Sequence, residues 1–281
     1  MPSGKQAIKR RIRSVEATKK ITQAMEMISI SKFQKQKQIL EKNKEYSDTL
    51  ERVCAQILKS VEKEDIFWTQ ENKEDHNPLT IVLTSDLGLC GAYNANVLKH
   101  FKKQAPKGSY LVVGIKGYSW FKYRNFKLSR DLIHSDDLNY IEISDAMIEV
   151  IQKYREGEIT SIHVFYTKFH NSVNFVPASK QLLPFLKPDV IDEDVLDSDT
   201  IFEPNAQTIL DEMIPMTVIS MVYRLYLESK TSEQASRRIA MENATDNAEE
   251  IVENLTLKYN QSRQAAITQE ISEIIAGADA L

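Results

Sequence analysis

The chain has 281 residues, of which 42% are hydrophobic and 27% charged, as is typical of a globular protein with one large or two modest domains. No apolar run approaches the roughly 18 residues that a membrane-spanning helix needs, which argues against direct membrane insertion. Cys54 and Cys90 are far apart and form no CxxC pair, so the sequence favours buried thiols in a reducing compartment.

The net charge of −4 is unevenly spread along the chain. Residues 1–44 hold twelve Lys or Arg and three Glu, which gives +9 and leaves −13 for the remainder. A basic helix can bind nucleic acid, an anionic membrane or an acidic protein surface, or it can be a solvated face without a ligand. Only Phe33 falls among these cations, and this lack of interleaved aromatic residues disfavours nucleic acid.

The N-terminal segment predicts one long helix over residues 4 to 60, because neither Gly nor Pro occurs between Gly4 and Pro78. Its seam follows heptad spacing with one four-residue slip near Ile39. The predicted seam positions are Ile21, Met25, Ile28, Lys32, Lys35, Ile39, Asn43, Tyr46, Leu50, Val53 and Ile57. We therefore expect residues 1–60 to be a coiled-coil helix.

The middle of the chain, residues 75–185, predicts a Rossmann-like α/β domain. Apolar runs at 79–84, 110–115, 160–168 and 173–180 are typical of strands, and the stretches 92–103, 118–123 and 136–157 favour helices. Such alternation indicates a mostly parallel sheet, with the last two strands as an antiparallel edge. The acidic, Pro-containing residues 186–206 are expected to be a linker.

The C-terminal segment, residues 207–281, predicts a second long helix over about 208–276. Its predicted seam comprises Met213, Met216, Ser220, Tyr223, Leu227, Lys230, Leu255, Tyr259, Ala266 and Ile267. The favoured arrangement is an antiparallel coiled coil of the two terminal helices, with the α/β domain inserted between them. Two separate helical arms or a parallel homodimer remain alternatives.

No catalytic, cofactor or metal site is predicted. The turn from Ser85 to Gly91 follows a strand and opens a helix, a geometry that can hold a phosphate, but it matches neither GxGxxG nor GxxxxGK[ST]. It is better interpreted as the tight corner that α/β packing needs. The five histidines have no metal-ligand spacing.

Several segments resemble motifs of one family, the gamma subunits of F-type ATP synthases. Residues 21–27 (ITQAMEM) resemble its ITKAMEMV motif, and residues 84–91 (TSDLGLCG) resemble TSDRGLCGG. Residues 240–248 (AMENATDNA) and 259–270 (YNQSRQAAITQE) are similar to its two C-terminal motifs, and residues 277–281 to its GAAAL end. The resemblance runs in order from residue 5 to residue 281.

The resemblance implies a central shaft inside a hexamer of three alpha and three beta subunits. It implies that the inserted domain sits with an epsilon subunit on a membrane-embedded c-ring, at the cytoplasmic face of the membrane, as a peripheral protein without catalytic residues. Residues that match partner contacts of the family are Met25, Lys32, Arg263, Gln264, Thr268, Gln269 and Glu270. The basic N-terminal segment would then face an acidic protein surface.

The chain departs from the family pattern at several positions. Leu87 stands where the family usually has Arg, Phe33-Gln34 replaces a Met-Arg type pair, and Gln261 is often Arg or Lys. These changes remove positive charge or alter packing at contact points. They leave the shaft of a paralogous ATP-driven motor as an alternative, and a homodimeric coiled-coil adaptor and a nucleotide-binding enzyme as rivals from other classes.

Overall fold

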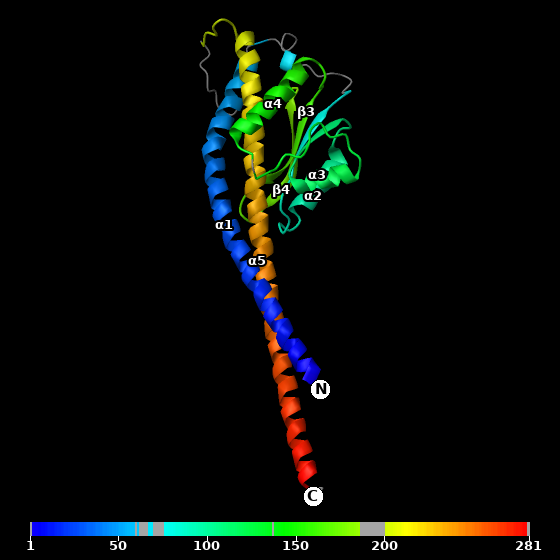
Figure 1. The fold of residues 1–281 in the computed structure, drawn as a ribbon. Helices are drawn as coiled ribbons and strands as arrows, with labels where there is room; N and C mark the ends of the chain where they lie inside the picture. Colours follow the sequence, from blue (N-terminus) through cyan, green and yellow to red (C-terminus); the bar gives the residue numbers. More distant parts are fainter. Residues whose placement is uncertain are drawn as a thin grey trace. The chain divides into compact units, whose positions relative to one another are not determined.

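The computed structural model describes residues 2–59, 61, 67–69, 76–136, 138–185 and 200–279 (Figure 1). The chain divides into two compact units, one of Met1–Ile30 with Arg237–Leu281 and one of Ser31–Ser236. Two helices, α1 (Pro2–Lys59) and α5 (Ala206–Asp279), contribute to both units. Most of the expected linker, residues 186–199, lies outside the described residues.

The first unit is an antiparallel pair of helical segments. Lys5 lies over the ring of Tyr259, the Lys19 ammonium is 2.8 Å from a Glu249 oxygen, and the hydroxyls of Thr22 and Thr245 are 2.8 Å apart. As the residue number falls along α1, that of its partner on α5 rises, which confirms the antiparallel pairing predicted from the sequence.

At two positions of α1 the predicted seam of this pair is wrong by one residue. Ile21 and Ile28 are 60% and 57% exposed, whereas the neighbouring Thr22 and Ser29 are buried. The Thr22 hydroxyl can donate to the Lys19 carbonyl at 2.9 Å and that of Ser29 to the Met25 carbonyl at 2.7 Å, so both can be buried at little cost. Small side chains let the two backbones approach closely, and the larger apolar residues are left outside.

The same shift recurs further along both helices. Four other predicted seam residues are wrong, because their side chains are exposed: Lys32, Lys35, Tyr46 and Met216. Ile267 is exposed as well, at 47%. In the second unit the buried side of α1 includes Leu40, Ser47 and Cys54 instead.

The second unit contains a four-stranded sheet. Its strands are β1 (Leu79–Leu83), β2 (Ser109–Val113), β3 (Ile162–Phe169) and β4 (Phe175–Leu183), in the order β2-β1-β3-β4. β1 pairs in parallel with β2 and β3, and β3 pairs antiparallel with β4. This confirms the α/β class with long helices and the antiparallel edge.

Helices cover both faces of this sheet (Figure 1). On one face, α2 (Tyr93–Gln104) and α3 (Ile115–Tyr123) close a small core around Val82, Phe101 and Phe121. On the other face, α4 (Tyr140–Arg155) joins α1 and α5 in a larger core that includes Ile81, Met147 and Leu225. A short 3-10 helix, η2 (Phe67–Thr69), contributes the buried Trp68 to the larger core.

The helix expected over 136–157 begins four residues later than predicted. Asn139 caps α4, since its side chain accepts hydrogen bonds from the backbone N–H groups of Ile141 and Glu142. The Glu142 carboxylate accepts in turn from the Asn139 N–H at 2.6 Å. This reciprocal capping fixes the helix start, and the Asn-x-x-Glu spacing was its signal in the sequence.

Helix α5 is surrounded by protein along residues 217–236, in the second unit. From Thr217 to Ser236 no residue is exposed, because the sheet covers one side of the helix and α1 another. A narrow heptad stripe was therefore the wrong pattern for this stretch. The helix is instead buried on all sides, and its polar residues need partners within the protein.

Candidate functional site

The sheet has one position where α/β folds usually bind ligands. β1 lies between β2 and β3, so the connection after β1 and the connection to β3 leave in opposite directions. Open α/β sheets form a crevice at such a switch point, outside the carboxyl ends of the strands. The Gly-containing turn from Ser85 to Gly91 follows β1 and therefore lies there.

In this chain α5 occupies the switch point. The Ser229 hydroxyl lies 2.8 Å from the Tyr93 hydroxyl, and the Ser232 hydroxyl donates to the Thr167 carbonyl near the end of β3 at 3.2 Å. One helical turn further, Ser236 donates to the Cys90 carbonyl at 2.7 Å. The place where a nucleotide would bind in a doubly wound fold is thus filled by the protein's own helix.

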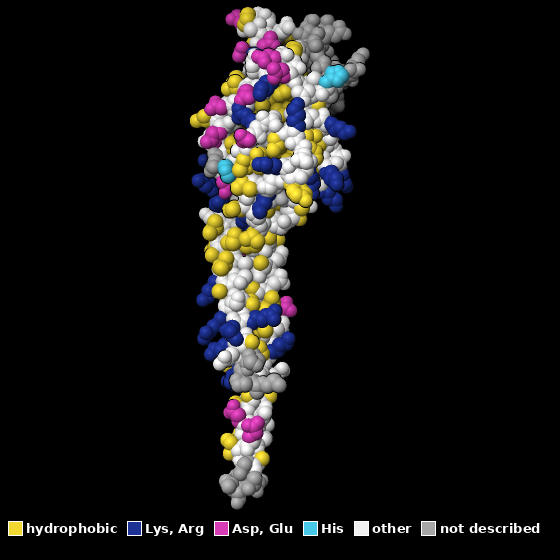
Figure 2. All heavy atoms as spheres, turned by 45° about the vertical axis from the view of Figure 1, so that its right-hand side comes forward, with side chains coloured by type: hydrophobic (Ala, Val, Ile, Leu, Met, Phe, Trp, Pro, Cys, Tyr) yellow, Lys and Arg dark blue, Asp and Glu magenta, His cyan; other side chains and the backbone are white. Residues whose placement is uncertain are grey.

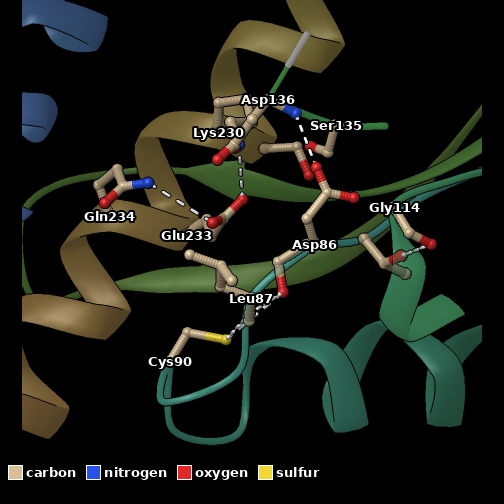
Figure 3. Close-up of polar contacts among 12 residues, drawn as sticks. Asp86, Leu87, Cys90, Gly114, Ser135, Asp136, Lys230, Glu233 and Gln234 are labelled. Atoms are coloured by element: carbon tan, nitrogen blue, oxygen red, sulfur yellow. Dashed lines mark hydrogen bonds and ion pairs between the residues drawn. The ribbon is translucent and has the colours of Figure 1, made fainter. Parts of the chain in front are cut away.

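Polar groups of the turn form hydrogen bonds within the protein. The Asn94 amide exchanges two hydrogen bonds with Ser85, at 3.0 Å to its N–H and 2.7 Å to its hydroxyl. The Asp86 carboxylate, 9% exposed, accepts from the backbone N–H of Ile115 at 3.0 Å and of Asp136 at 2.9 Å (Figure 3). Asp86 thereby caps α3 and anchors the loop before α4.

A buried ion-pair group joins this loop to α5 (Figure 3). The Lys230 ammonium, in a side chain only 5% exposed, lies 3.0 Å from a Glu233 oxygen and also pairs with Asp136. Burial lowers the pKa of Lys230, but the charges of Glu233 and Asp136 outweigh it and raise the pKa above its ordinary value. Lys230 is therefore a charged structural contact between the helix and the inserted domain.

The described residues show neither a metal-binding cluster nor a membrane-spanning helix. Among them, no three His, Cys, Asp or Glu residues are grouped to hold a metal ion, and no helix is long and apolar enough to cross a membrane. Burial raises the pKa of the Cys54 thiol, which lies 3.0 Å from the Thr217 hydroxyl. Both cysteines are buried, as expected from the sequence, and neither forms a disulfide with a residue that the structure describes.

Two motifs that lie far apart in the sequence meet in the first unit. Thr22 of the ITQAMEM stretch contacts Thr245 of the AMENATDNA stretch, and Met241, Thr245 and Ala248 are buried in the helix pair. The predicted contact residue Met25, three residues after Thr22, is half-buried. The motifs therefore supply the small residues that let the two helices approach.

The predicted contact residues of α5 all lie on its surface. Arg263, Gln264, Thr268, Gln269 and Glu270 are exposed, and Arg263 makes no ion pair or hydrogen bond with any residue that the structure describes. The Thr268 hydroxyl donates to the Gln264 carbonyl at 3.0 Å, and the Gln269 amide to Glu273 at 2.9 Å. Lys32 belongs to the second unit and is also exposed.

From Ile267 to Ala276, the described side chains leave α5 without a covered side. Every residue from Ile267 to Ala276 is exposed, including four isoleucines, Ile267, Ile271, Ile274 and Ile275, at 47%, 51%, 72% and 56%. Ile271 lies four residues after Ile267, and Ile274 and Ile275 lie three and four residues after Ile271, which places all four near one face of the helix. Of the four, only Ile267 was among the predicted seam residues, although the other three are visible in the sequence as well.

The polar contact between α5 and the switch point was not predicted from the sequence either. Its signal is the run SKTSEQAS, residues 229–236, which has one apolar residue in eight inside a long helix. A run this polar is ordinarily expected at a solvated face. Here Ser229, Ser232 and Ser236 bond to the inserted domain, Lys230 pairs with Asp136, and the Thr231 hydroxyl donates to the Leu227 carbonyl of its own helix.

Comparisons with known proteins agree with this geometry. The family model described as "ATP synthase" matches residues 4–281. The ATP synthase gamma chain of Clostridium acetobutylicum is 39% identical over 279 residues, covering 98% of this chain and 97% of the relative. That of Fusobacterium nucleatum is 34% identical over 287 residues and covers 99% of both chains.

Solved structures show the same fold. A chain of the Euglena gracilis mitochondrial ATP synthase OSCP/F1/c-ring structure matches with a TM-score of 0.69 and 16% identity, covering 100% of this chain and 95% of that one. A chain of the Tetrahymena thermophila central stalk and c-ring matches with a TM-score of 0.58 and 23% identity, covering 80% and 99%.

The structure is a pair of long helices with an inserted α/β domain, and the protein's own helix fills the ligand crevice of that domain. This arrangement defines a class of protein that acts through mechanical contact. The chain belongs to the family of ATP synthase gamma chains, as the family model and the identities above 30% over nearly the full length show.

Proposed function

We propose that the chain is the central rotor shaft of an F-type ATP synthase. In this role it couples rotation of a membrane-embedded c-ring to the conformational cycle of an alpha/beta hexamer, in ATP synthesis or hydrolysis. The observation that carries the proposal is the end of α5, where four isoleucines lie within ten exposed residues and would be covered by another molecule.

The composition of this end suits a sleeve that covers the helix without binding it tightly. A strongly apolar surface would hold one orientation, and a fully charged one would lose hydration inside the sleeve. The surface combines the small Ala265, the short Thr268, the amide Gln269 and a narrow isoleucine stripe. Such a mixture supports contacts that form and break as the shaft turns.

The exposed residues of α5 are the proposed contacts with the hexamer. Arg263 and Gln264 would bind loops of the beta subunits, with Thr268, Gln269 and Glu270 beside them. The absence of any internal partner for Arg263 in the described part of the chain supports this role, because a guanidinium on a covered surface needs an acceptor. Met25 and the exposed Lys32 are proposed contacts along α1.

The proposed mechanism needs no catalytic group on this chain. A single shaft has no three-fold symmetry, so at each angle it makes different contacts with three equivalent catalytic sites. A ligand or partner shifts an equilibrium by its differential affinity for the states, and the shaft would bias the three sites in this way. Activity would then depend on assembly.

The remaining parts follow the same assignment. Residues 1–60 and 207–281 would form the shaft, residues 75–185 the inserted domain, and residues 186–206 the linker. The inserted domain would sit with an epsilon subunit on the c-ring, at the cytoplasmic face of the membrane, without entering it. Three alpha and three beta subunits would surround the shaft.

The test is the composition of the complex that contains this chain. The tagged chain is extracted in mild detergent, and the native mass and subunit stoichiometry of what purifies with it are measured. Three alpha-like and three beta-like subunits per copy, with c-ring and epsilon, are expected. A hexamer that lacks a ring even after cross-linking in the membrane would indicate a paralogous motor, and no hexamer at all would contradict the proposal.

A substitution on the shaft tests the sleeve directly. Ala265→Leu enlarges an exposed side chain of α5, and we expect ATP turnover of the assembled complex to fall clearly. Ala95→Leu adds the same volume to an exposed position of α2 and is expected to leave turnover unchanged. Equal turnover of both variants and the parent complex would contradict a close sleeve at Ala265.

A further inference from the structure

One face of the inserted domain is strongly basic, although the whole chain is acidic. Residues 87–130 contain nine cations and no Asp or Glu, whereas the chain as a whole carries −4. All nine side chains are exposed. They are Lys99, Lys102, Lys103, Lys107, Lys116, Lys122, Arg124, Lys127 and Arg130.

These charges are almost free of intramolecular partners. Within the part of the chain that the structure describes, only Arg130 pairs with a carboxylate, that of Glu149 at the border of the face. Figure 2 shows Lys and Arg side chains gathered on the right-hand side of the inserted domain, and acidic side chains mainly on its left. Unpaired charges of one sign repel each other, so an anionic partner would relieve this repulsion.

The fold holds the ends of α2 and α3 together on a rigid aromatic base. The Tyr110 hydroxyl donates to the Pro106 carbonyl at 3.2 Å, and the Tyr110 N–H to the Lys127 carbonyl at 3.0 Å. The ring centroids of Phe101 and Phe126 lie 5.9 Å apart. This base places the cations at and just after the end of α2 (Lys102, Lys103, Lys107) near those at and just after the end of α3 (Lys122, Arg124, Lys127).

Aromatic side chains are interspersed with these cations at the surface. The ring of Tyr123 is 85% exposed, and the Arg124 guanidinium lies 4.2 Å from the centroid of the Trp120 ring. Trp and Tyr beside Lys and Arg are typical of the boundary between a bilayer and water, where amphipathic rings are favoured. Seven of the nine cations are Lys, a residue depleted from protein–protein interfaces.

We propose that this basic face, formed by α2, α3 and the segment up to Arg130, binds the anionic headgroups of phospholipids at a bilayer surface. The choice of a membrane as the source of anions rests on the proposed function, in which the inserted domain is carried on a ring embedded in a bilayer. The contact is diffuse and electrostatic, so fluid lipid could follow the domain as it moves. It would help to hold the domain close to the membrane.

Vesicle binding by the purified full chain tests this assignment. Vesicles of phosphatidylglycerol mixed with phosphatidylcholine are compared with vesicles of phosphatidylcholine alone in a co-sedimentation assay. Binding is expected only to the anionic vesicles, and it should weaken as salt is raised, because exposed charges are screened over about 10 Å at 0.1 M ionic strength. Equal binding to both vesicles, or binding that ignores salt, would overturn the proposal.

Matched substitutions show whether this particular face is responsible. The triple variant K102Q/K103Q/K107Q should bind anionic vesicles on the order of 100-fold more weakly, from about 5-fold per lysine. The control K9Q/R10Q/R13Q removes three exposed cations from α1 and should change binding far less. The variant K102R/K103R/K107R should retain binding. Equal losses in the triple variant and the control would show a net-charge effect and overturn the assignment.

Two further measurements distinguish lipid binding from binding to an acidic protein and from failure of the proposed function. Binding of the chain to polyglutamate but not to anionic vesicles would indicate an acidic protein partner and would overturn the lipid assignment. Co-purification of K102Q/K103Q/K107Q with alpha-like and beta-like subunits is measured separately. If the parent chain fails to assemble, the proposed function fails while the vesicle result still decides the basic face.

Discussion

Two stretches of the same helix, α5, have opposite surroundings. From Thr217 to Ser236 no residue is exposed, and from Ile267 to Ala276 every residue is exposed. The buried stretch carries Lys230, Glu233 and several hydroxyls, whereas the exposed stretch carries four isoleucines. Polarity along this helix is therefore a poor guide to burial: α1 and the inserted domain enclose the polar stretch, whereas no described part of the chain covers the isoleucines at the end.

The largest expected effect on the buried stretch comes from removing its central charge. Lys230→Ala removes the ammonium that lies 3.0 Å from the Glu233 carboxylate, whose side chain is 2% exposed. Breaking one partner of a buried ion pair costs about 3–5 kcal/mol, because the other charge remains desolvated. We expect a loss of that size in the free energy of unfolding of the assembled or isolated chain, measured by denaturant titration.

A double substitution controls for this interpretation. Lys230→Met combined with Glu233→Gln removes both charges and keeps most of the volume, and replacing a buried ion pair in this way is often nearly neutral. We therefore expect the double variant to be more stable than Lys230→Ala. Equal destabilisation in both would mean that packing at Lys230, and not its charge, holds α5 to the loop around Asp136.

A smaller effect is expected from Glu228, whose Oε2 atom is buried without a hydrogen-bond partner. Burial raises the pKa of Glu228 above its ordinary 4.5, although Arg224, Lys168 and Lys44 act to lower it. The folded state therefore binds this proton more tightly than the unfolded state. The corresponding stability is fully present below pH 4.5 and is lost as the pH rises through the folded-state pKa.

The measurement is the pH dependence of the free energy of unfolding. Glu228→Gln should lack this decline, so the difference between variant and parent should shift in favour of the variant as the pH rises above 4.5. Glu149 provides a control of opposite sign, since hydrogen bonds from Lys153 and Arg130 lower its pKa. Its contribution is present above pH 4.5 and lost as the pH falls, and Glu149→Gln should remove that loss.

Elements with strong local signals could be predicted from the sequence. The stretch without Gly or Pro gave α1 (Pro2–Lys59), and apolar runs between turn residues gave four strands near their observed places. The register of the helix pair could not be read in the same way. It is set by side-chain size and by hydroxyls that bond to their own helix, as at Thr22 and Ser29, and a seam drawn through the isoleucines misses both.

The surroundings of a polar residue are less predictable still. Nothing local in the run SKTSEQAS shows that Ser229, Ser232 and Ser236 contact the carboxyl ends of β1 and β3, because those contacts join residues far apart in the sequence. The proposed hexamer contacts, such as Arg263 and Gln264, stay predictions for a related reason. Their partners lie on other chains, and exposure alone does not name them.

The smallest effect on stability is expected at the exposed end of α5. Ile271→Ser with Ile274→Ser changes two side chains that are 51% and 72% exposed, so the free energy of unfolding of the isolated chain should change by no more than about 0.5 kcal/mol per site. In the assembled complex the same variant should lower ATP turnover or the yield of hexamer, because the sleeve loses two apolar contacts. A matched pair of exposed apolar positions, Ile141→Ser with Ile148→Ser on α4, should affect neither quantity comparably. If the α5 variant assembles and turns over ATP like the parent, the isoleucine stripe needs no cover, and the contrast between the two stretches of α5 would carry no functional meaning.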